Sequence, residues 1–247
     1  MPTNLDTATQ TLRELVLSGA FPPDRKLGEE AVARALGLSR TPARIAMATL
    51  EREGLLLRIP RRGYRVRSFT IDEVAGAIDV RGELEAMGAR LVAERGLDQA
   101  IARRLETALA QSEAIIEHSP LDVADRLAWT QANMDFHDAL IDGSGNVALR
   151  AAFEQVNRIP LASPRAIIFG SAATDRSREQ LRRSHEDHVR VLEAIRARRG
   201  SRAAEIMRDH ALRSSENKRR NFAALGTETQ LIGQSGTALV RLVPAAA

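Results

Sequence analysis

Apolar residues in the first part of the chain recur at a helical period and then alternate with polar residues. In the segment 28–36, and again after Pro42, they recur every three or four residues, which predicts two short helices. Gly54 ends the second helix, and the alternating segments 55–59 and 64–67 predict a β-hairpin. The expected buried stripe of the second helix consists of Ile45, Met47, Ala48 and Leu50.

The second of these helices begins with residue types that suit DNA. Ser39 is expected to cap its N-terminus through the hydroxyl, and Thr41 and Pro42 fall in its first turn. Arg40 and Arg44 lie one turn apart, on a face other than the apolar stripe. In the major groove, Arg pairs with guanine, while hydroxyls reach phosphate oxygens. We therefore expect this helix to be the recognition helix of a helix-turn-helix.

The turn of the hairpin, Pro60-Arg61-Arg62-Gly63, is basic, as expected of a wing that contacts DNA. An ordinary amphipathic helix with solvated arginines would explain Arg40 or Arg44 alone. The helix, turn, helix and basic hairpin, however, follow one another in the order of a winged helix-turn-helix. The amino-terminal segment is therefore predicted to bind double-stranded DNA.

Helical periodicity also dominates the remainder of the chain. A first helix is expected near Leu5–Ser18, and Thr70-Ile71-Asp72-Glu73 has the form of a capping box, so another should begin at about residue 71 and run to 95. Further helices are expected over 98–118, 121–142, 146–158, 175–199 and 201–222. We predict a mainly α fold. Its parts are a winged helix-turn-helix at 1–69, an all-helical bundle at 70–222 and a flexible tail at 223–247.

The distribution of charge supports a DNA-binding amino terminus. The chain of 247 residues has a net charge of +4, yet residues 1–69 hold 12 Lys and Arg against 7 Asp and Glu, and the remainder is close to neutral. The chain contains no cysteine, which excludes disulfides and thiolate metal sites. It has no apolar run long enough for a membrane span and no signal-peptide pattern, so a cytoplasmic location is expected.

All five histidines lie in the predicted bundle, and three of them could share a metal ion with an amide oxygen. Asn133 and His137 are four residues apart and project from one face of a helix. His188 and His210 lie on later helices, and His185, one turn before His188, is an alternative to it. Three imidazoles and one oxygen suit a divalent metal inside a bundle, although helical histidines are more often surface or core residues.

Taken together, these segments resemble a GntR-type transcription regulator of the FadR-like group, with an all-helical FCD effector domain. The resemblance covers roughly residues 8–220. In the first domain it is carried by LRELVLSGAFPP, KLGEEAVARALGLSRTPAR, LEREGLL and RRGYRV. In the second domain it is carried by VRGELEAMGARL, NMDFHDALIDGSGN, HVRVLEAI and IMRDHAL.

The resemblance implies which residues contact DNA and which bind metal. The residues that correspond to DNA contacts are Ser39, Arg40, Thr41 and Arg44 in the recognition helix, and Arg61, Arg62 and Gly63 at the wing tip. The residues that correspond to metal ligands are Asn133, His137, His188 and His210, which favours His188 over His185. The implied ion is zinc, nickel or manganese, with zinc first.

One of these ligand positions departs from the family pattern. The family usually has Asp where this chain has Asn133. An amide oxygen can still coordinate a cation, but it brings no negative charge. The departure is expected to weaken metal binding, or to accompany an effector that contacts the protein directly.

The resemblance further implies an effector site and a dimer. Arg81 corresponds to an arginine that lines the effector cavity; the alternative is an exposed pair with Glu85 one turn later. Together with a metal, Arg81 would hold a small carboxylate. A homodimer would place two recognition helices one DNA turn apart on a palindromic operator, and the effector would release it.

Two other functions fit parts of the pattern. The histidines could serve a metal-dependent hydrolase, with Asp135, Asp138 or Glu186 as its general base. That reading leaves the helix-turn-helix without a role. An architectural DNA-binding protein without an effector would leave the histidine-rich bundle without one. A ligand-responsive repressor accounts for both halves of the sequence.

Overall fold

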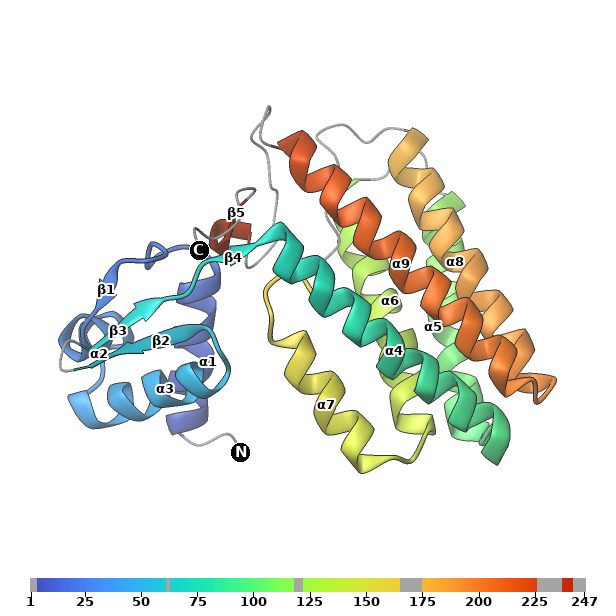
Figure 1. Cartoon of the computed structure of the whole chain (residues 1–247), viewed down its shortest axis with the longest axis horizontal. Helices are drawn as coiled ribbons and strands as arrows, with labels where there is room; N and C mark the ends of the chain where they lie inside the picture. The colour runs from blue at the N-terminus through green and yellow to red at the C-terminus, as the bar shows by residue number, and fades with distance from the viewer. Residues whose placement is uncertain (1–3, 61–62, 118–121, 165–174, 226–236, 242–247) are drawn as a thin grey trace. The chain divides into compact units, whose positions relative to one another are not determined.

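The computed structural model describes residues 4–60, 63–117, 122–164, 175–225 and 237–241. These residues form two compact units (Figure 1). The first unit contains the described residues up to Val74, together with 158–161 and 237–241, and the second contains the other described residues. Among the helices of these segments, none combines the length and the apolar character needed to cross a membrane.

The first unit combines three helices with a small antiparallel sheet. Its helices are α1 (Asn4–Leu17), α2 (Glu29–Leu36) and α3 (Arg40–Arg52). Its three-stranded sheet consists of β1 (Lys26–Leu27), β2 (Leu56–Ile59) and β3 (Gly63–Val66), in the order β1-β3-β2. The helix-turn-helix and the hairpin predicted from the sequence are therefore present.

The turn between α2 and α3 depends on a left-handed glycine. Gly37 has φ +65° and ψ +30°, a conformation that costs glycine little. The next amide, that of Leu38, donates to the Ala33 carbonyl at 3.0 Å, which closes the end of α2. Val32, Met47 and Leu50 are buried and join the two helices to the rest of the unit. The turn thereby sets where α3 begins.

The carboxy-terminal residues differ from the predicted flexible tail. Residues Thr237–Leu239 form a short 3₁₀ helix, and β5 (Val240–Arg241) pairs in parallel with β4 (Phe69–Thr70). Leu239 is fully buried and Val240 nearly so, and this burial opposes fraying. The prediction is therefore wrong for residues 237–241.

The second unit is a bundle of long helices. After α4 (Ile71–Arg95), it contains α5 (Gln99–Glu117), α6 (Val123–Gly143), α7 (Val147–Asn157), α8 (Asp175–Arg196) and α9 (Gly200–Leu225). The predicted capping box begins α4: the Thr70 amide donates to the Glu73 carboxylate at 2.7 Å, and the Glu73 amide donates to Thr70 Oγ1 at 3.0 Å.

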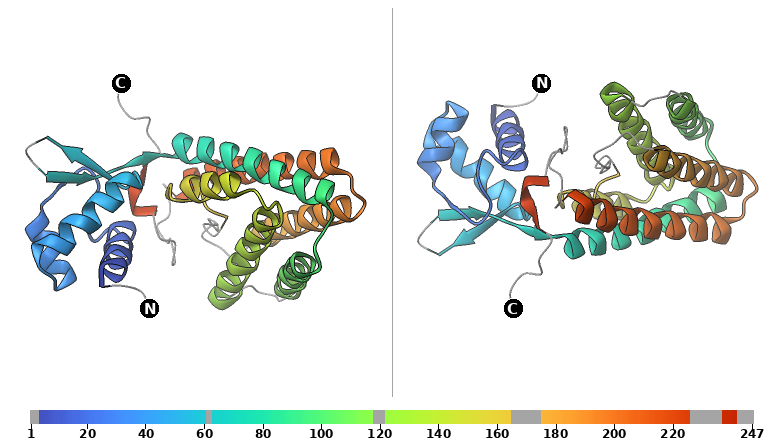
Figure 2. Two further views of the ribbon diagram at one scale, coloured as in Figure 1. Left: turned by 90° about the horizontal axis from the view of Figure 1, so that it is seen from below. Right: turned by 90° about the horizontal axis from the view of Figure 1, so that it is seen from above.

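Helices α4 and α9 run side by side in the bundle (Figures 1 and 2). A methyl group placed on Gly82 of α4 would lie 2.3 Å from the Ala211 Cβ of α9, so the two helices approach closely because both residues are small. Apolar side chains of α4, α5, α6, α8 and α9 form the main core, which includes Ala89, Phe136 and Met207. This core fixes the helices from which the buried histidines project.

Candidate DNA interface and effector site

The exposed face of α3 presents the residues expected to contact DNA. Arg40, Thr41, Arg44 and Ile45 are exposed, whereas the opposite face buries Ala43, Ala46, Met47 and Leu50. Thr41, Arg44 and Ile45 follow helical spacing and share one face. Ile45 was expected in the buried stripe, but this expectation is wrong, because its side chain is 40% exposed beside Arg44. In DNA recognition an apolar side chain at such a position can contact a thymine methyl group.

The cap of α3 also differs from the prediction. Ser39 occupies the N-cap position, but its hydroxyl makes no capping hydrogen bond. The residue three positions later is Pro42, which has no N–H to donate. Only the Ser39 carbonyl takes part in the helix, accepting from the Ala43 amide at 3.5 Å. The Ser39 hydroxyl is therefore left for another partner.

The two arginines of α3 differ in their surroundings. An Arg40 guanidinium nitrogen lies 3.4 Å from Glu30 Oε2, and both side chains are largely exposed. Arg44 makes no hydrogen bond or ion pair with any residue of the described segments. An exposed ion pair contributes little to stability, so Arg40 can exchange Glu30 for a phosphate or base at small cost.

At the wing, Gly63 opens β3 with φ +90°, and a Cβ there would lie 3.1 Å from the Leu27 carbonyl oxygen. Both facts favour glycine at this position. Arg61 and Arg62 lie outside the described residues.

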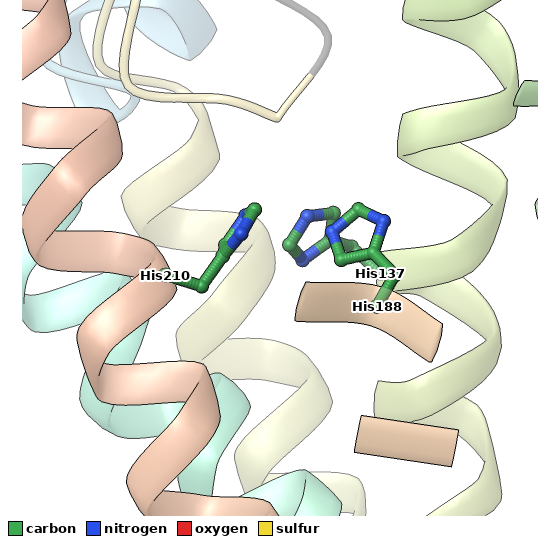
Figure 3. Close-up of side chains that lie close together, drawn as sticks. All are labelled: His137, His188 and His210. Carbon is green, nitrogen blue, oxygen red and sulfur yellow. The ribbon is translucent and has the colours of Figure 1, made fainter. Parts of the chain in front are cut away.

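Three histidines meet in the interior of the second unit. His137 of α6, His188 of α8 and His210 of α9 are buried, and one nitrogen from each lies within 4.8 Å of the others. Figure 3 shows the three rings turned toward one another from their separate helices. Their ring centroids are 4.6–5.4 Å apart. His185, the alternative to His188, instead places Nδ1 2.8 Å from Ser112 Oγ on α5.

Two of these histidines contact a carboxylate through Nδ1. Glu85 Oε1 lies 2.8 Å from His137 Nδ1, and Asp187 Oδ2 lies 3.5 Å from His210 Nδ1. Sequence reasoning missed both as neighbours of the cluster, although Asp187 directly precedes His188. A carboxylate on one imidazole nitrogen leaves the other nitrogen to face a cation. Because Nδ1 of His137 and of His210 faces a carboxylate, Nε2 of each ring is the nitrogen that can bind a metal ion.

Electrostatics favours the neutral form of His188 and of His210. Burial lowers the pKa of His188 well below its ordinary value, and His210 and His137 add to the effect. Burial also lowers the pKa of His210, against the opposing influence of its contact with Asp187. A neutral imidazole has a lone pair for a metal ion, whereas an imidazolium has none.

Arg81 is buried beside the histidine cluster. Its side chain is 2% exposed and that of Glu85 is fully buried, so the alternative of an exposed surface pair is wrong. Arg81 Nε lies 3.2 Å from Glu85 Oε1, and the guanidinium also donates to the Ala162 carbonyl. Burial opposes ionisation of Glu85, but attraction to His137 and Arg81 outweighs it and lowers the pKa of this carboxyl. Arg81 is consequently held by an ionised carboxylate.

A polar cavity opens beside this cluster. We call it the polar cavity; its lining includes Arg81, Trp129, Asn133, His137, His210 and Lys218. The Asn133 amide nitrogen donates to the Pro164 carbonyl at 2.8 Å. That hydrogen bond leaves Asn133 Oδ1 as the atom able to act as a ligand.

The carboxylates suggested as bases for a hydrolase do not line the polar cavity. Asp135 accepts a hydrogen bond from Gln131 at 2.7 Å, and Asp138 pairs with Arg150 at 2.7 Å. Glu186 is exposed. A general base must lie within hydrogen-bonding reach of the reacting group, so the hydrolase hypothesis loses its acid–base candidates.

Comparisons with known proteins agree with this geometry. Residues 5–66 match the bacterial regulatory proteins of the gntR family, and residues 77–213 match the FCD domain. The chain is 30% identical over 203 residues to the HTH-type transcriptional repressor GlaR of Escherichia coli, covering 81% of this chain and 89% of that protein. It is 32% identical over 146 residues to the uncharacterized HTH-type regulator YdhC of Bacillus subtilis, covering 59% and 63% respectively.

A solved structure shows the same fold. Escherichia coli McbR/YncC superposes with a TM-score of 0.58 at 21% identity, covering 85% of this chain and 95% of that one. The relatives and both matched families are transcriptional regulators and not enzymes. The chain therefore belongs to the GntR family of bacterial regulatory proteins, with an FCD domain, and is a ligand-responsive DNA-binding transcriptional regulator.

Proposed function

We propose that the protein is a homodimeric repressor that a small carboxylate releases from a palindromic operator. The observation that carries the proposal is the buried cluster of His137, His188 and His210 beside Arg81 and the polar cavity. A metal ion on three imidazoles and a nearby guanidinium can together hold one carboxylate. We expect the protein to act in the cytoplasm, since its DNA partner is there.

The residues present fit a divalent metal ion. His137 Nε2 and His188 Nε2 are buried and have no hydrogen-bond partner among the described residues. Leaving buried polar atoms unpaired costs free energy, and a metal ion would satisfy such nitrogens. Three imidazole nitrogens, one each from His137, His188 and His210, suit zinc, nickel or manganese, with zinc the first candidate. Asn133 Oδ1 would be a fourth, uncharged donor.

The chain's own residues supply the other half of the carboxylate site. Glu85 fixes Arg81 from behind, through the 3.2 Å contact to Nε. Arg81 can then offer its remaining N–H groups to a carboxylate in the cavity. Bound metal would supply a Lewis-acidic point of attachment next to it. Both groups are buried, so the attraction for an anion is screened little by solvent.

The homodimer is proposed to form through an exposed apolar stripe on α4. Val80 is 53% exposed and Met87 is 41% exposed, and the partly buried Leu84 and Leu91 continue the same stripe. Spacings of four, three and four residues are those of a helix seam. A second copy of the chain presents the same stripe, so a two-fold pairing would cover it.

Dimerisation through this stripe has a direct test. We expect Met87→Glu to convert a dimer, twice the 27.0 kDa of the chain, into a monomer, because each interface would bury two unpaired carboxylates. Light scattering after gel filtration measures the mass. Leu127→Glu is the matched control, since Leu127 is 61% exposed on α6 and should leave the dimer intact. A dimeric Met87→Glu variant would place the interface elsewhere.

We propose that the protein represses transcription when it is bound to its operator. The relative GlaR is described as a transcriptional repressor, and an operator-bound dimer released by its effector is the simplest form of such control. A typical coupling of about 1–3 kcal/mol between the two sites would change DNA affinity by about 5–150-fold.

A screen of small carboxylates tests the proposed function as a whole. We expect at least one carboxylate to raise the melting temperature of the zinc-loaded protein, and to do so less after treatment with a chelator. The same compound should weaken binding to a DNA site selected from random duplexes by about 5–150-fold. If every carboxylate leaves both the melting temperature and DNA affinity unchanged, the proposed effector class is wrong.

A further inference from the structure

A large apolar side chain is exposed on the face of α3 that is expected to contact DNA. Among the Val, Leu, Ile, Met and aromatic residues described in the first unit, only Leu38 and Ile45 are exposed, at 37% and 40%. Ile45 belongs to α3, whereas Leu38 precedes this helix in the turn after Gly37. The exposed face of α3 therefore offers an aliphatic group in addition to its arginines and hydroxyls.

The helical positions place Ile45 well inside this face. Successive residues of an α-helix are about 100° apart, so Arg44 lies about 60° to one side of Thr41 and Ile45 about 40° to the other. The buried residues Ala46 and Leu50 lie on the opposite side of the helix. Ile45 consequently points to solvent between Thr41 and Thr49, and not along the edge of the core.

The hydroxyl group nearest to Ile45 in the next turn is already paired. Thr49 Oγ1 donates to the Ile45 carbonyl at 3.1 Å and accepts a hydrogen bond from an Arg52 guanidinium nitrogen at 3.2 Å. The Thr49 hydroxyl thus has no hydrogen left to donate to a base. This side of α3 presents an aliphatic surface, while Arg44 supplies hydrogen-bond donors on the other side.

Helix stability does not explain an isoleucine at this position. A β-branched side chain loses rotamer freedom in a helix, and alanine or an unbranched polar residue is a better helix former. Single exposed apolar residues are common on protein surfaces, so exposure alone indicates no function. What distinguishes Ile45 is its position, because a side chain beside Arg44 faces the edges of base pairs when α3 lies in the major groove.

Thymine is the base that offers a methyl group in the major groove. Its 5-methyl group projects there, whereas guanine, adenine and cytosine present hydrogen-bond donors and acceptors. Isoleucine can pack against the methyl group but can pair with none of the polar groups. A polar base edge covered by isoleucine would lose water without gaining a hydrogen bond, which costs free energy. An isoleucine at the base edges therefore favours thymine.

We propose that Ile45 is a specificity-determining residue that contacts the 5-methyl group of a thymine in the operator. This inference rests on the proposed recognition of an operator through α3. Neighbouring Cα atoms are about 3.8 Å apart and successive base pairs about 3.4 Å apart, so the thymine should lie within about two base pairs of the base that Arg44 contacts. Arg44 and Ile45 would thus read neighbouring positions of one site.

Removing the methyl group from the DNA tests the contact without changing the protein. The probe is a duplex that the full-length protein selects from random sequences, with its thymines replaced one at a time by deoxyuridine. Deoxyuridine has the same hydrogen-bonding groups but no 5-methyl group. We expect at least one replacement close to the base contacted by Arg44 to lower the affinity, measured by fluorescence anisotropy, by about fourfold, because one buried methyl group is lost.

Variants of the first unit link this effect to Ile45. Ile45→Ala should bind the thymine and deoxyuridine duplexes equally, within about 1.5-fold, because the methyl group has lost its partner. Its binding to random DNA should match that of the wild type, which also shows that it is folded. Ile45→Val keeps the branch at Cβ and should retain a preference for thymine of about twofold or more. Leu38→Ala is the matched control, since it removes a side chain of similar exposure outside α3 and should leave the preference unchanged.

The outcomes separate this inference from the function of the protein. If no thymine of the selected duplex is sensitive to the loss of its methyl group, or if the sensitivity persists in Ile45→Ala, the contact is refuted, while the protein remains a DNA-binding regulator. If the protein selects no preferred site, both operator recognition and the role of Ile45 are refuted.

Discussion

Replacing His137 and His210 together with alanine is expected to abolish metal binding and the response to effector, without weakening DNA binding by the effector-free protein. Each residue faces the cluster from a different helix, so the double change leaves a single imidazole, that of His188. One neutral nitrogen with an uncharged amide is too weak a donor set for zinc at ordinary concentrations. Bound metal, measured by elemental analysis, should fall from about one per chain to background.

Thermal stability gives a second measure of the same loss. Zinc at about 100 times its dissociation constant stabilises a folded protein by about 2.7 kcal/mol, which for a domain of this size is a shift of about 5–10 °C. We expect this shift in the wild-type protein and none in the His137→Ala, His210→Ala variant. DNA affinity without effector should stay within about twofold, since the changes lie in the second unit.

His185→Ala is the matched control for these histidines. His185 is on the same helix as His188, but its Nδ1 contacts Ser112 and not the cluster. This variant should retain metal, the zinc-dependent shift and the effector response. Wild-type protein that holds no metal and gains no stability from zinc, nickel or manganese would refute the metal proposal outright. Retention of metal by the double variant would show that the ion is bound elsewhere.

Local signals in the sequence predicted those parts of the fold that local interactions determine. The Thr70–Glu73 capping box begins α4 where expected, because two side chains and two amides three residues apart are sufficient to form it. The turn at Gly37 was likewise readable, since a glycine after an amphipathic segment ends helices. The order of the helices and strands could be predicted from such capping and turn residues together with the spacing of apolar residues.

The parts that the sequence did not predict depend on packing between distant segments. An apolar residue such as Ile45 is by default assigned to the core, and only the position of α3 shows that it shares the exposed face of Arg44. The strand β5 pairs with β4 across about 170 residues of chain, which leaves no local pattern.

The candidate site shows the same division. The spacing of the histidines allowed His137, His188 and His210 to share a metal ion but left His185 as an alternative to His188. The resemblance to the family then favoured His188. Arg81 and Glu85 have the spacing of an ordinary surface pair, so spacing alone could not tell that α4 buries both. Lys218 begins a Lys-Arg-Arg run that looks like a solvated face, yet it is buried while the next two residues are exposed.

Replacing Arg44 with alanine is expected to abolish recognition of the operator while leaving non-specific DNA binding nearly unchanged. Arg44 is exposed near the N-terminal end of α3 and has no partner in the described segments, so its guanidinium is available for a base. A bidentate contact to guanine is worth about 1–3 kcal/mol, and a symmetric dimer would lose two such contacts. Affinity for a selected site should therefore fall by about 30-fold or more.

The salt dependence of binding distinguishes a base contact from a phosphate contact. If Arg44 reads a base, the slope of log affinity against log salt for random DNA should be the same in Arg44→Ala and wild type. Arg52→Ala is the matched control, because Arg52 lies at the far end of α3, where its guanidinium contacts Thr49 and the Ala48 carbonyl. It should keep the preference for the selected site. If Arg44→Ala instead lowers specific and random binding equally and reduces the slope by about one, Arg44 contacts phosphate and the specificity of α3 comes from its neighbours.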